Sequence, residues 1–172
     1  MHKRRVHIWL LDVPRIKKPK THIKEFNYLK DKNEIERLLA KAREEGYPVF
    51  IFYLTAITTG MRAGELAGLK WHDVDFDNRL ITVARSFDST TKNGEIRRIP
   101  ILNQLLSSLS EWKLQKTSEW VFINEAGNPY GAGARIYKSI FHRVLKTANL
   151  SIRFHDLRHT FASHWMINPL SR

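Results

Sequence analysis

The chain of 172 residues contains no cysteine, and this absence excludes several kinds of site. Without cysteine there is no disulfide framework, no thiolate nucleophile and no cysteine-based zinc site. The sequence also lacks an uninterrupted apolar run of the ~18 residues that a membrane span needs. Its start, MHKRRVHIWLLDVP, has neither a long apolar core nor a small-residue cleavage site, so we reject a signal peptide. We therefore expect a cytoplasmic protein with no membrane partner.

Acidic residues are scarce relative to basic ones. Lys and Arg number 29 against 17 Asp and Glu, which gives a net charge of +12 at pH 7. Such an excess favours a polyanion as partner, because each neutralised phosphate releases counterions. An anionic membrane surface or an RNA scaffold would suit the charge equally well, so charge alone leaves the partner open.

Composition divides the chain into a short arm and one folded unit. Residues 1–24 are basic, hold two prolines and show no steady period, which predicts a linker or arm. Residues 25–172 have the length and apolar content of a single domain with a sizeable core.

Most of the folded unit has helical periodicity. Ile35, Leu38, Leu39 and Ala42 recur at the spacing of one helix face, and Gly46 follows as a stop signal. The next segment is apolar nearly all round, which indicates a buried helix. Six helical segments are predicted in all, over 31–46, 47–60, 61–69, 103–115, 133–150 and 155–167.

Two segments in the middle of the chain have strand character instead. Residues 79–86 and 95–102 are β-branched and roughly alternating, and Asn93-Gly94 between them is a strong hairpin signal. Residues 119–124 form either a short strand or an extended link. The predicted fold is α+β, mainly helical with one small antiparallel sheet.

Three separate segments carry polar residues that suit a phosphodiester. In the last helix, His155 and Arg158 lie three apart and project from one face. A guanidinium holds phosphate oxygens through its fork, and an imidazole donates a hydrogen bond or moves a proton. Arg62 follows the glycine that ends an apolar helix, and Glu65 is placed to pair with it. Lys92, beside the hairpin turn, can swing onto a ligand.

Each of these residues also has a structural explanation. The His155 and Arg158 pair is what a solvated helix face of a basic protein would show. Arg62 and Glu65 would then be an exposed ion pair of small worth, and lysine is common in exposed turns. His159 and His164 are predicted to point elsewhere and to serve packing or the surface.

The order of the pieces carries a family resemblance. TTGMRAGELAGLKWHDVD, TKNGEIRRIPI and FHDLRHTFAS resemble the catalytic domain of tyrosine recombinases, the phage-integrase family, from about residue 26 to 166. By this resemblance, Arg62 matches the first catalytic arginine and Lys92 the general acid for the departing 5′-hydroxyl. His155 and Arg158 match the family's H-x-x-R motif, and Glu65 the acidic residue that supports the site.

The resemblance implies site-specific recombination of double-stranded DNA through a 3′-phosphotyrosine. Two preorganised arginines would stabilise the charge on the phosphoryl oxygens without a metal or other cofactor. Members of the family act as tetramers on DNA, so the expected partners are duplex DNA and further protomers, with no small-molecule substrate.

The family's nucleophilic tyrosine follows the H-x-x-R helix, whereas every tyrosine here precedes His155. They are Tyr28, Tyr47, Tyr53, Tyr130 and Tyr137. We therefore expect that residues 25–172 are a catalytic domain without its C-terminal part, that residues 1–24 connect to a preceding DNA-clamping domain, and that the chain alone does not cleave DNA. Whether the chain is a trimmed piece or a natural truncation stays open.

Other functions remain as alternatives. They are a non-catalytic DNA-binding module, a type IB topoisomerase-like domain and, less favoured, an RNA-binding scaffold. The segment from Asp73 to Asn78 resembles the start of a calcium loop, but it lacks the glycine at the sixth position and the glutamate at the twelfth. No histidine and carboxylate cluster has the spacing of a zinc site.

Overall fold

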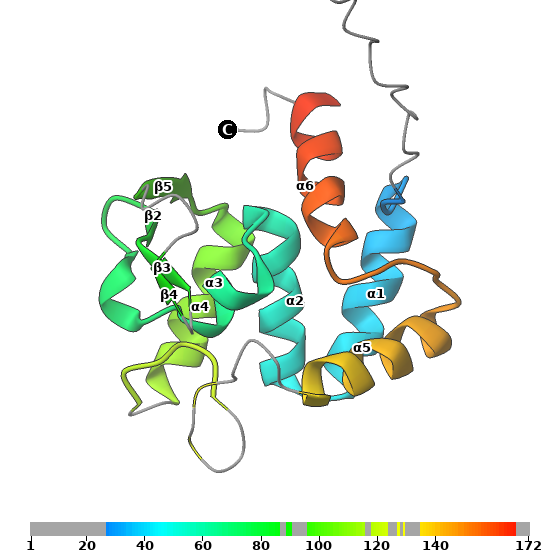
Figure 1. The fold of residues 1–172 in the computed structure, drawn as a ribbon, viewed down its shortest axis with the longest axis horizontal. Helices are drawn as coiled ribbons and strands as arrows, with labels where there is room; N and C mark the ends of the chain where they lie inside the picture. Colours follow the sequence, from blue (N-terminus) through cyan, green and yellow to red (C-terminus); the bar gives the residue numbers. More distant parts are fainter. Residues whose placement is uncertain are drawn as a thin grey trace, which may run out of the picture.

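The structure, a computed structural model, describes residues 27–86, 89–90, 96–115, 118–123, 127, 129 and 135–167. The predicted arm at 1–24 and the predicted turn at Asn93-Gly94 lie outside these residues. Within them, the chain forms a helical part and a strand-containing part that share one hydrophobic core (Figure 1).

The first helix, α1, spans Lys32–Glu44 and matches the prediction for 31–46. Its N-cap is Asp31, whose carboxylate accepts a hydrogen bond from the backbone N–H of Glu34 at 2.9 Å. Leu38 and Ala42 are buried, and Ile35 and Leu39 pack against the core at its margin. The predicted apolar face of α1 is therefore confirmed.

Helix α2, Tyr47–Thr59, is the centre of the fold (Figure 1). It contacts α1, α3 (Ala63–Ala67), α4 (Asn103–Leu114) and α6 (Asp156–Ile167), which explains why it is apolar nearly all round. Its buried threonine hydroxyls, on Thr55 and Thr59, donate to the backbone carbonyls four residues earlier. Their polar groups are thereby satisfied inside the core.

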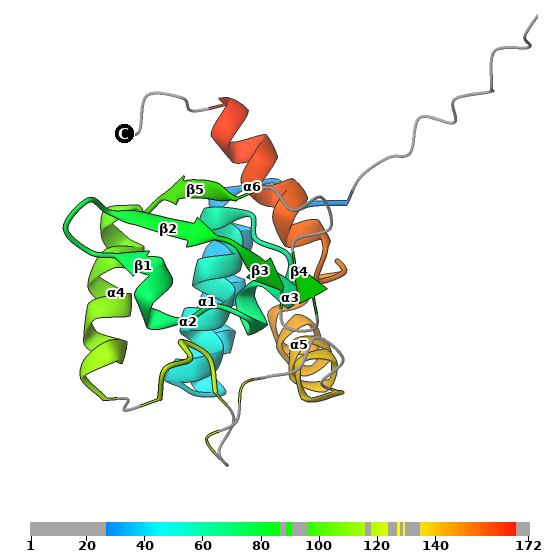
Figure 2. The same cartoon turned by 60° about the vertical axis from the view of Figure 1, so that its left-hand side comes forward.

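The strands form the predicted antiparallel arrangement (Figure 2). The main sheet has the order β1 (Val74–Asp75), β2 (Leu80–Val83), β5 (Arg97–Pro100), and β2 pairs with β5 from Leu80↔Pro100 to Val83↔Arg97. Two further short strands, β3 (Arg85–Ser86) and β4 (Ser89–Thr90), pair with each other. The pairing of β1, which follows the short helix η1 (Trp71–Asp73), was not predicted.

Residues 118–123 form an extended link rather than a regular strand. Trp120 makes an isolated bridge with Lys70, and Val121 donates its N–H to the Leu69 carbonyl at 3.0 Å. The indole N–H of Trp112 donates to the Val121 carbonyl at 2.8 Å, which fastens the link to α4. The second of the two interpretations for this segment is therefore the right one.

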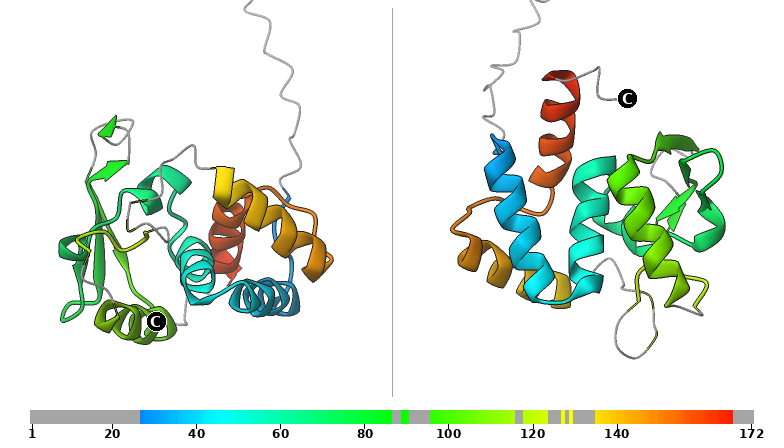
Figure 3. Two further views of the ribbon diagram at one scale, coloured as in Figure 1. Left: turned by 90° about the horizontal axis from the view of Figure 1, so that it is seen from below. Right: turned by 180° about the vertical axis from the view of Figure 1, so that it is seen from behind.

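Helices α5 (Arg135–Ala148) and α6 complete the helical part. The segment before α1 lies against α6, where Leu29 N–H donates to the buried hydroxyl of Thr160 at 3.0 Å. His164 Nε2 lies 2.9 Å from the Leu29 carbonyl oxygen. Views from below and from behind show α6 beside both α1 and α2 (Figure 3). These two contacts join residues that are 131 and 135 positions apart in sequence, and they fix the position of α6.

Two negative findings apply to the described part of the chain. It contains no helix with the length and apolarity that crossing a membrane demands, and no group of three or more metal-ligating side chains. In the segment compared with a calcium loop, Asp73 accepts hydrogen bonds from Arg85 and from the Lys70 N–H, and Asp75 accepts from Asn78. These carboxylates are thus engaged within the protein.

Candidate active site

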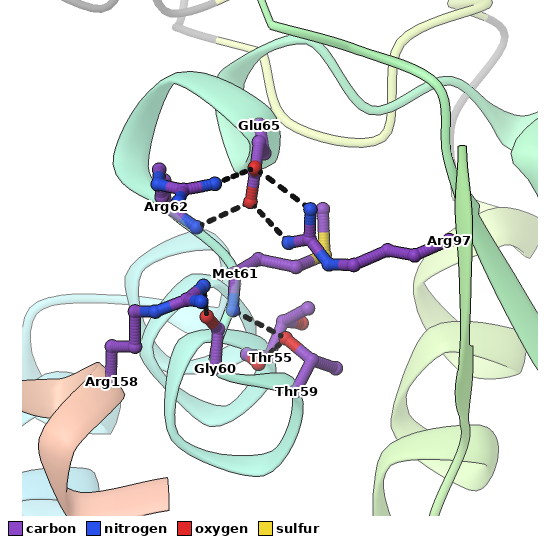
Figure 4. A network of polar contacts seen from close by, with 8 residues as sticks. All are labelled: Thr55, Thr59, Gly60, Met61, Arg62, Glu65, Arg97 and Arg158. Carbon is purple, nitrogen blue, oxygen red and sulfur yellow. Dashed lines mark hydrogen bonds and ion pairs between the residues drawn. The ribbon is translucent and has the colours of Figure 1, made fainter. Parts of the chain in front are cut away.

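The site is built on the sharp turn that ends α2. Gly60 adopts a left-handed conformation, with φ of 63°, and its N–H donates to the Ala56 carbonyl at 3.0 Å. This is the usual C-terminal stop of a helix, and glycine adopts it without steric cost. The chain reverses there, and Arg62 becomes the N-cap of the short helix α3 (Figure 4).

Glu65 holds Arg62 at this turn. One carboxylate oxygen accepts from Arg62 Nη1 at 2.8 Å and the other from the Arg62 backbone N–H at 2.7 Å. The pair predicted from the sequence is therefore present. This pair is not an exposed ion pair of small worth, however, because the Glu65 side chain is only 3% exposed. The Arg62 side chain, at 51%, reaches from this buried carboxylate toward solvent.

Arg158 reaches the same turn from α6. Its Nη1 donates to the Gly60 carbonyl at 2.7 Å, across 98 residues of sequence. Close packing supports this contact, because a Cβ at Gly60 would lie 2.5 Å from Cδ1 of Phe161. The absence of a side chain at Gly60 thus lets α6 approach α2 closely enough for Arg158 to bind there.

A third guanidinium, Arg97 on β5, completes the cluster and was missed by the sequence analysis. Its Nη1 and Nη2 donate to the two oxygens of Glu65 at 3.0 and 2.6 Å. A signal for it was present. Alternation along β5 puts Arg97 on the face of buried Ile99, and a charged residue on an inward face calls for a buried partner.

The charges of the cluster influence one another. Although burial raises the pKa of Glu65, hydrogen bonds from Arg97 and from Arg62 outweigh it and hold that pKa below its usual value. Burial, and then the charges of Arg62 and Arg97, lower the pKa of Arg158. Three guanidiniums and one carboxylate leave a local excess of two positive charges, which favours an anion.

A cavity of about 350 Å³ lies next to this cluster. Its lining includes Arg97, Arg158, Thr59, Gly60 and Phe161, so two of the three guanidiniums border it. The arrangement can bind an anion with several oxygens and stabilise negative charge that develops on it.

Of the remaining predicted site residues, one is described by the structure and one is not. His155 is exposed, directly before the first residue of α6, and its carbonyl accepts from the Arg158 N–H at 3.1 Å. Its ring contacts His159 in an edge-to-face arrangement with centroids 5.1 Å apart. His159 therefore does not point elsewhere as predicted, whereas His164 does. Lys92 lies outside the described residues, between β4 and β5.

Two tyrosines are engaged away from the arginine cluster. The side chain of Tyr53 is fully buried in α2. The hydroxyl of Tyr47 donates to Glu111 at 2.9 Å and to the Ser108 carbonyl at 3.1 Å. Tyr28 lies in the segment before α1, and Tyr130 and the side chain of Tyr137 are outside the described part of the chain.

Comparison with known proteins gives a consistent result. The model of the phage integrase family matches residues 29–169. A tyrosine recombinase XerC-like protein of Caldanaerobacter subterraneus subsp. tengcongensis is 28% identical over 164 residues, covering 76% of this chain and 41% of that protein. The type 1 fimbriae regulatory protein FimB of Escherichia coli K12 is 29% identical over 157 residues, covering 83% of this chain and 72% of that protein. The chain thus spans less than half of the first relative and nearly three quarters of the second.

Solved structures show the same fold. The Tn1549 transposon integrase, in complex with transposon right end DNA, has a TM-score of 0.72 at 21% identity, covering 87% of this chain and 56% of that one. The lambda integrase catalytic core has a TM-score of 0.66 at 21% identity, covering 84% of this chain and 86% of that one.

Proposed function

Because the chain belongs to the phage integrase family, we propose that its arginine cluster binds one phosphodiester of double-stranded DNA during site-specific recombination. Arg62 and Arg158 would hold the non-bridging oxygens and stabilise the charge that builds on them as the strand is cleaved. Glu65 would keep Arg62 in place. No metal or organic cofactor is needed for this chemistry, since the guanidiniums supply the positive charge.

One observation carries this proposal. Arg158 donates to the carbonyl of Gly60, two residues before Arg62, although the two arginines are far apart in sequence. A protein that only needs a basic surface does not require two arginines at one turn, because fixing exposed arginines in position adds little stability. Two guanidiniums held at one turn, one by a buried carboxylate and one by a backbone carbonyl, are suited to a single anionic group.

Lys92 and His155 would complete the reaction. In the family's chemistry a tyrosine oxygen attacks phosphorus, the bond to the 5′-oxygen breaks, and that oxygen takes a proton. We assign the proton donor to Lys92, and a hydrogen-bonding or proton-moving role to His155. The position of His155 directly before α6, one helical turn from Arg158, supports its part in the same site.

The nucleophile is proposed to be absent from this chain. Tyr53 is buried and the hydroxyl of Tyr47 is engaged with Glu111, so neither is presented to a DNA strand. The chain itself would bind DNA without forming a covalent bond to it. Further protomers on the same DNA are proposed as partners, as in the lambda integrase, which has been solved as a dimer bound to a core site.

The first test concerns binding. A duplex selected by the wild-type chain from a randomised pool is titrated, and fluorescence anisotropy gives the dissociation constant. Arg62→Ala and Arg158→Ala should each weaken binding roughly 10- to 100-fold, because hydrogen bonds to a charged group contribute about 1.5–3 kcal/mol. Arg143→Ala is the matched control. It removes the same charge, from a guanidinium bonded to Glu45, and should change binding much less. Equal effects of all three variants would refute the assignment.

The second test concerns the covalent step. The selected duplex, nicked near its centre to trap a cleaved strand, is incubated with the chain and analysed on a denaturing gel. We expect no band of protein linked to DNA. A band that survives SDS would show that one of the chain's own residues is the nucleophile.

A further inference from the structure

Glu65 accepts four hydrogen bonds, and Arg97 supplies two of them. Arg97 forms a bidentate pair, with Nη1 on one carboxylate oxygen at 3.0 Å and Nη2 on the other at 2.6 Å. Arg62 supplies the other two, from Nη1 at 2.8 Å and from its backbone N–H at 2.7 Å. A carboxylate offers about four lone-pair positions, so those of Glu65 are fully used. The orientation of this carboxylate therefore depends on both arginines (Figure 4).

Arg97 also limits how Arg62 can bind to Glu65. An isolated arginine and carboxylate prefer a bidentate pair, in which two N–H groups of the fork meet both oxygens. Arg97 holds that bidentate position through Nη1 and Nη2, and the guanidinium of Arg62 meets the carboxylate through Nη1 alone. The rest of the Arg62 fork is thereby kept out of the carboxylate contact and is available to an anion.

We propose that Arg97 is a positioning residue for Arg62 and acts through Glu65. By occupying the bidentate position, it prevents Glu65 from binding the whole Arg62 fork and fixes Arg62 in the orientation that binds phosphate. The identity of the anion as a DNA phosphodiester rests on the function proposed above. The coupling from Arg97 to Glu65 to Arg62 rests on the contacts of the cluster.

A simpler role for Arg97 would be to add positive charge, and the two roles predict opposite results. If charge alone matters, Glu65→Gln removes a negative charge and tightens phosphate binding. Combined with Arg97→Ala, it then restores the wild-type net charge and the wild-type affinity. If Arg97 positions Arg62 through Glu65, each single variant weakens binding, and the double variant is no better than either.

The experiment is a titration of the chain with inorganic phosphate. Binding is monitored through the side-chain Nε–H signal of Arg62 in nuclear magnetic resonance spectra. We expect Arg97→Ala and Glu65→Gln each to weaken phosphate binding about tenfold and to shift the Arg62 signal in the phosphate-free protein. The double variant should match the weaker single variant. Arg97→Lys keeps the charge but loses the fork, so its affinity should lie closer to that of Arg97→Ala than to the wild type.

Arg143→Ala is the control for losing an arginine–carboxylate pair that lies outside the arginine cluster. Arg143 binds both oxygens of Glu45 at 2.6 and 2.5 Å on the outside of the helical part. This variant should lower the thermal midpoint without changing the Arg62 signal or the phosphate affinity. If Arg97→Ala does not fold, Arg97→Lys and Glu65→Gln still distinguish the two roles.

The proposal is overturned if Glu65→Gln tightens binding, if the double variant regains wild-type affinity, or if Arg97→Lys equals the wild type. Failure of the DNA experiments would leave these results unaffected, because phosphate alone is the probe. A coupled arginine cluster in a chain that does not bind duplex DNA would mean that the cluster serves a different phosphate compound.

Discussion

The buried carboxylate of Glu65 contributes to the acid stability of the chain. Burial raises its pKa, but the hydrogen bonds from Arg97 and Arg62 lower it further, so the pKa in the folded chain lies below the ordinary value of 4.5. A carboxyl group with a lowered pKa contributes stability above its unfolded pKa, and this contribution is lost as the pH falls through the folded pKa.

Glu65→Gln should therefore cost more stability at pH 6 than at pH 3. The free energy of unfolding, measured with urea at both values, gives the difference between wild type and variant. At pH 6 the variant leaves Arg97 and Arg62 facing a neutral amide, and the loss should approach the roughly 3–5 kcal/mol that follows removal of one partner from a buried ion pair. A difference that stays constant with pH would contradict the assignment.

The residue scale is also where sequence reasoning was least complete. Arg62, Glu65 and Arg158 were found because each stands in a local motif, and the structure brings them together at Gly60. Burial of Glu65 could not be predicted, since it depends on Arg97, which is 32 residues away. The catalytic roles of Lys92 and His155 remain predictions.

At the scale of elements, the site depends on how closely α6 approaches the end of α2. Gly60 allows this approach in two ways. Its left-handed backbone ends α2, and its lack of a Cβ leaves room for the ring of Phe161. Arg158 lies one turn before Phe161 on the same helix, so the packing of that ring positions the guanidinium.

Gly60→Ala should destabilise the fold and weaken phosphate binding together. The left-handed conformation costs an alanine about 1–2 kcal/mol, and overlap with Phe161 adds roughly 1–3 kcal/mol. Gly127→Ala is the control, because Gly127 also has a positive φ, of 79°, but no atom of the described residues lies within 4 Å of the added Cβ. Urea unfolding and phosphate titration of both variants give the comparison. Equal losses of stability in the two variants would mean that the contact with Phe161 is unimportant. If that contact matters, adding Phe161→Leu to Gly60→Ala should recover part of the lost stability.

Elements with a strong period were predicted well, and the shortest strands were not. Helices α1, α2, α4 and α5 follow the predicted ranges closely, because each carries several turns of apolar spacing. The pairing of β2 with β5 was predicted from the alternation of both segments. The predicted turn at Asn93-Gly94 lies outside the described residues, and the chain already reverses before it, because Ser86 pairs with Ser89. Strand β1 has two residues, too few for any period to be visible, and its place is set by pairing with β2.

At the scale of the whole molecule, the chain is a helical part and a strand-containing part joined through α2 and one continuous core. The arginine cluster draws on both parts, since Arg158 comes from α6 and Arg97 from β5. The predicted fold class and the family resemblance are confirmed by this architecture and by the family match over residues 29–169. The resemblance succeeded because its motifs mark the end of α2, the β-hairpin and the start of α6, the positions that build the site.

Arg62 and Arg158 should bind a single anion beside Gly60. Crystals of the chain soaked in tungstate, a heavy analogue of phosphate, test it directly through the anomalous scattering of tungsten. We predict one strong anomalous peak within hydrogen-bonding distance of both guanidiniums, lost in Arg158→Ala crystals and retained in Arg143→Ala crystals. Tungsten bound elsewhere on the surface, with neither Arg62 nor Arg158 in contact, would contradict the account.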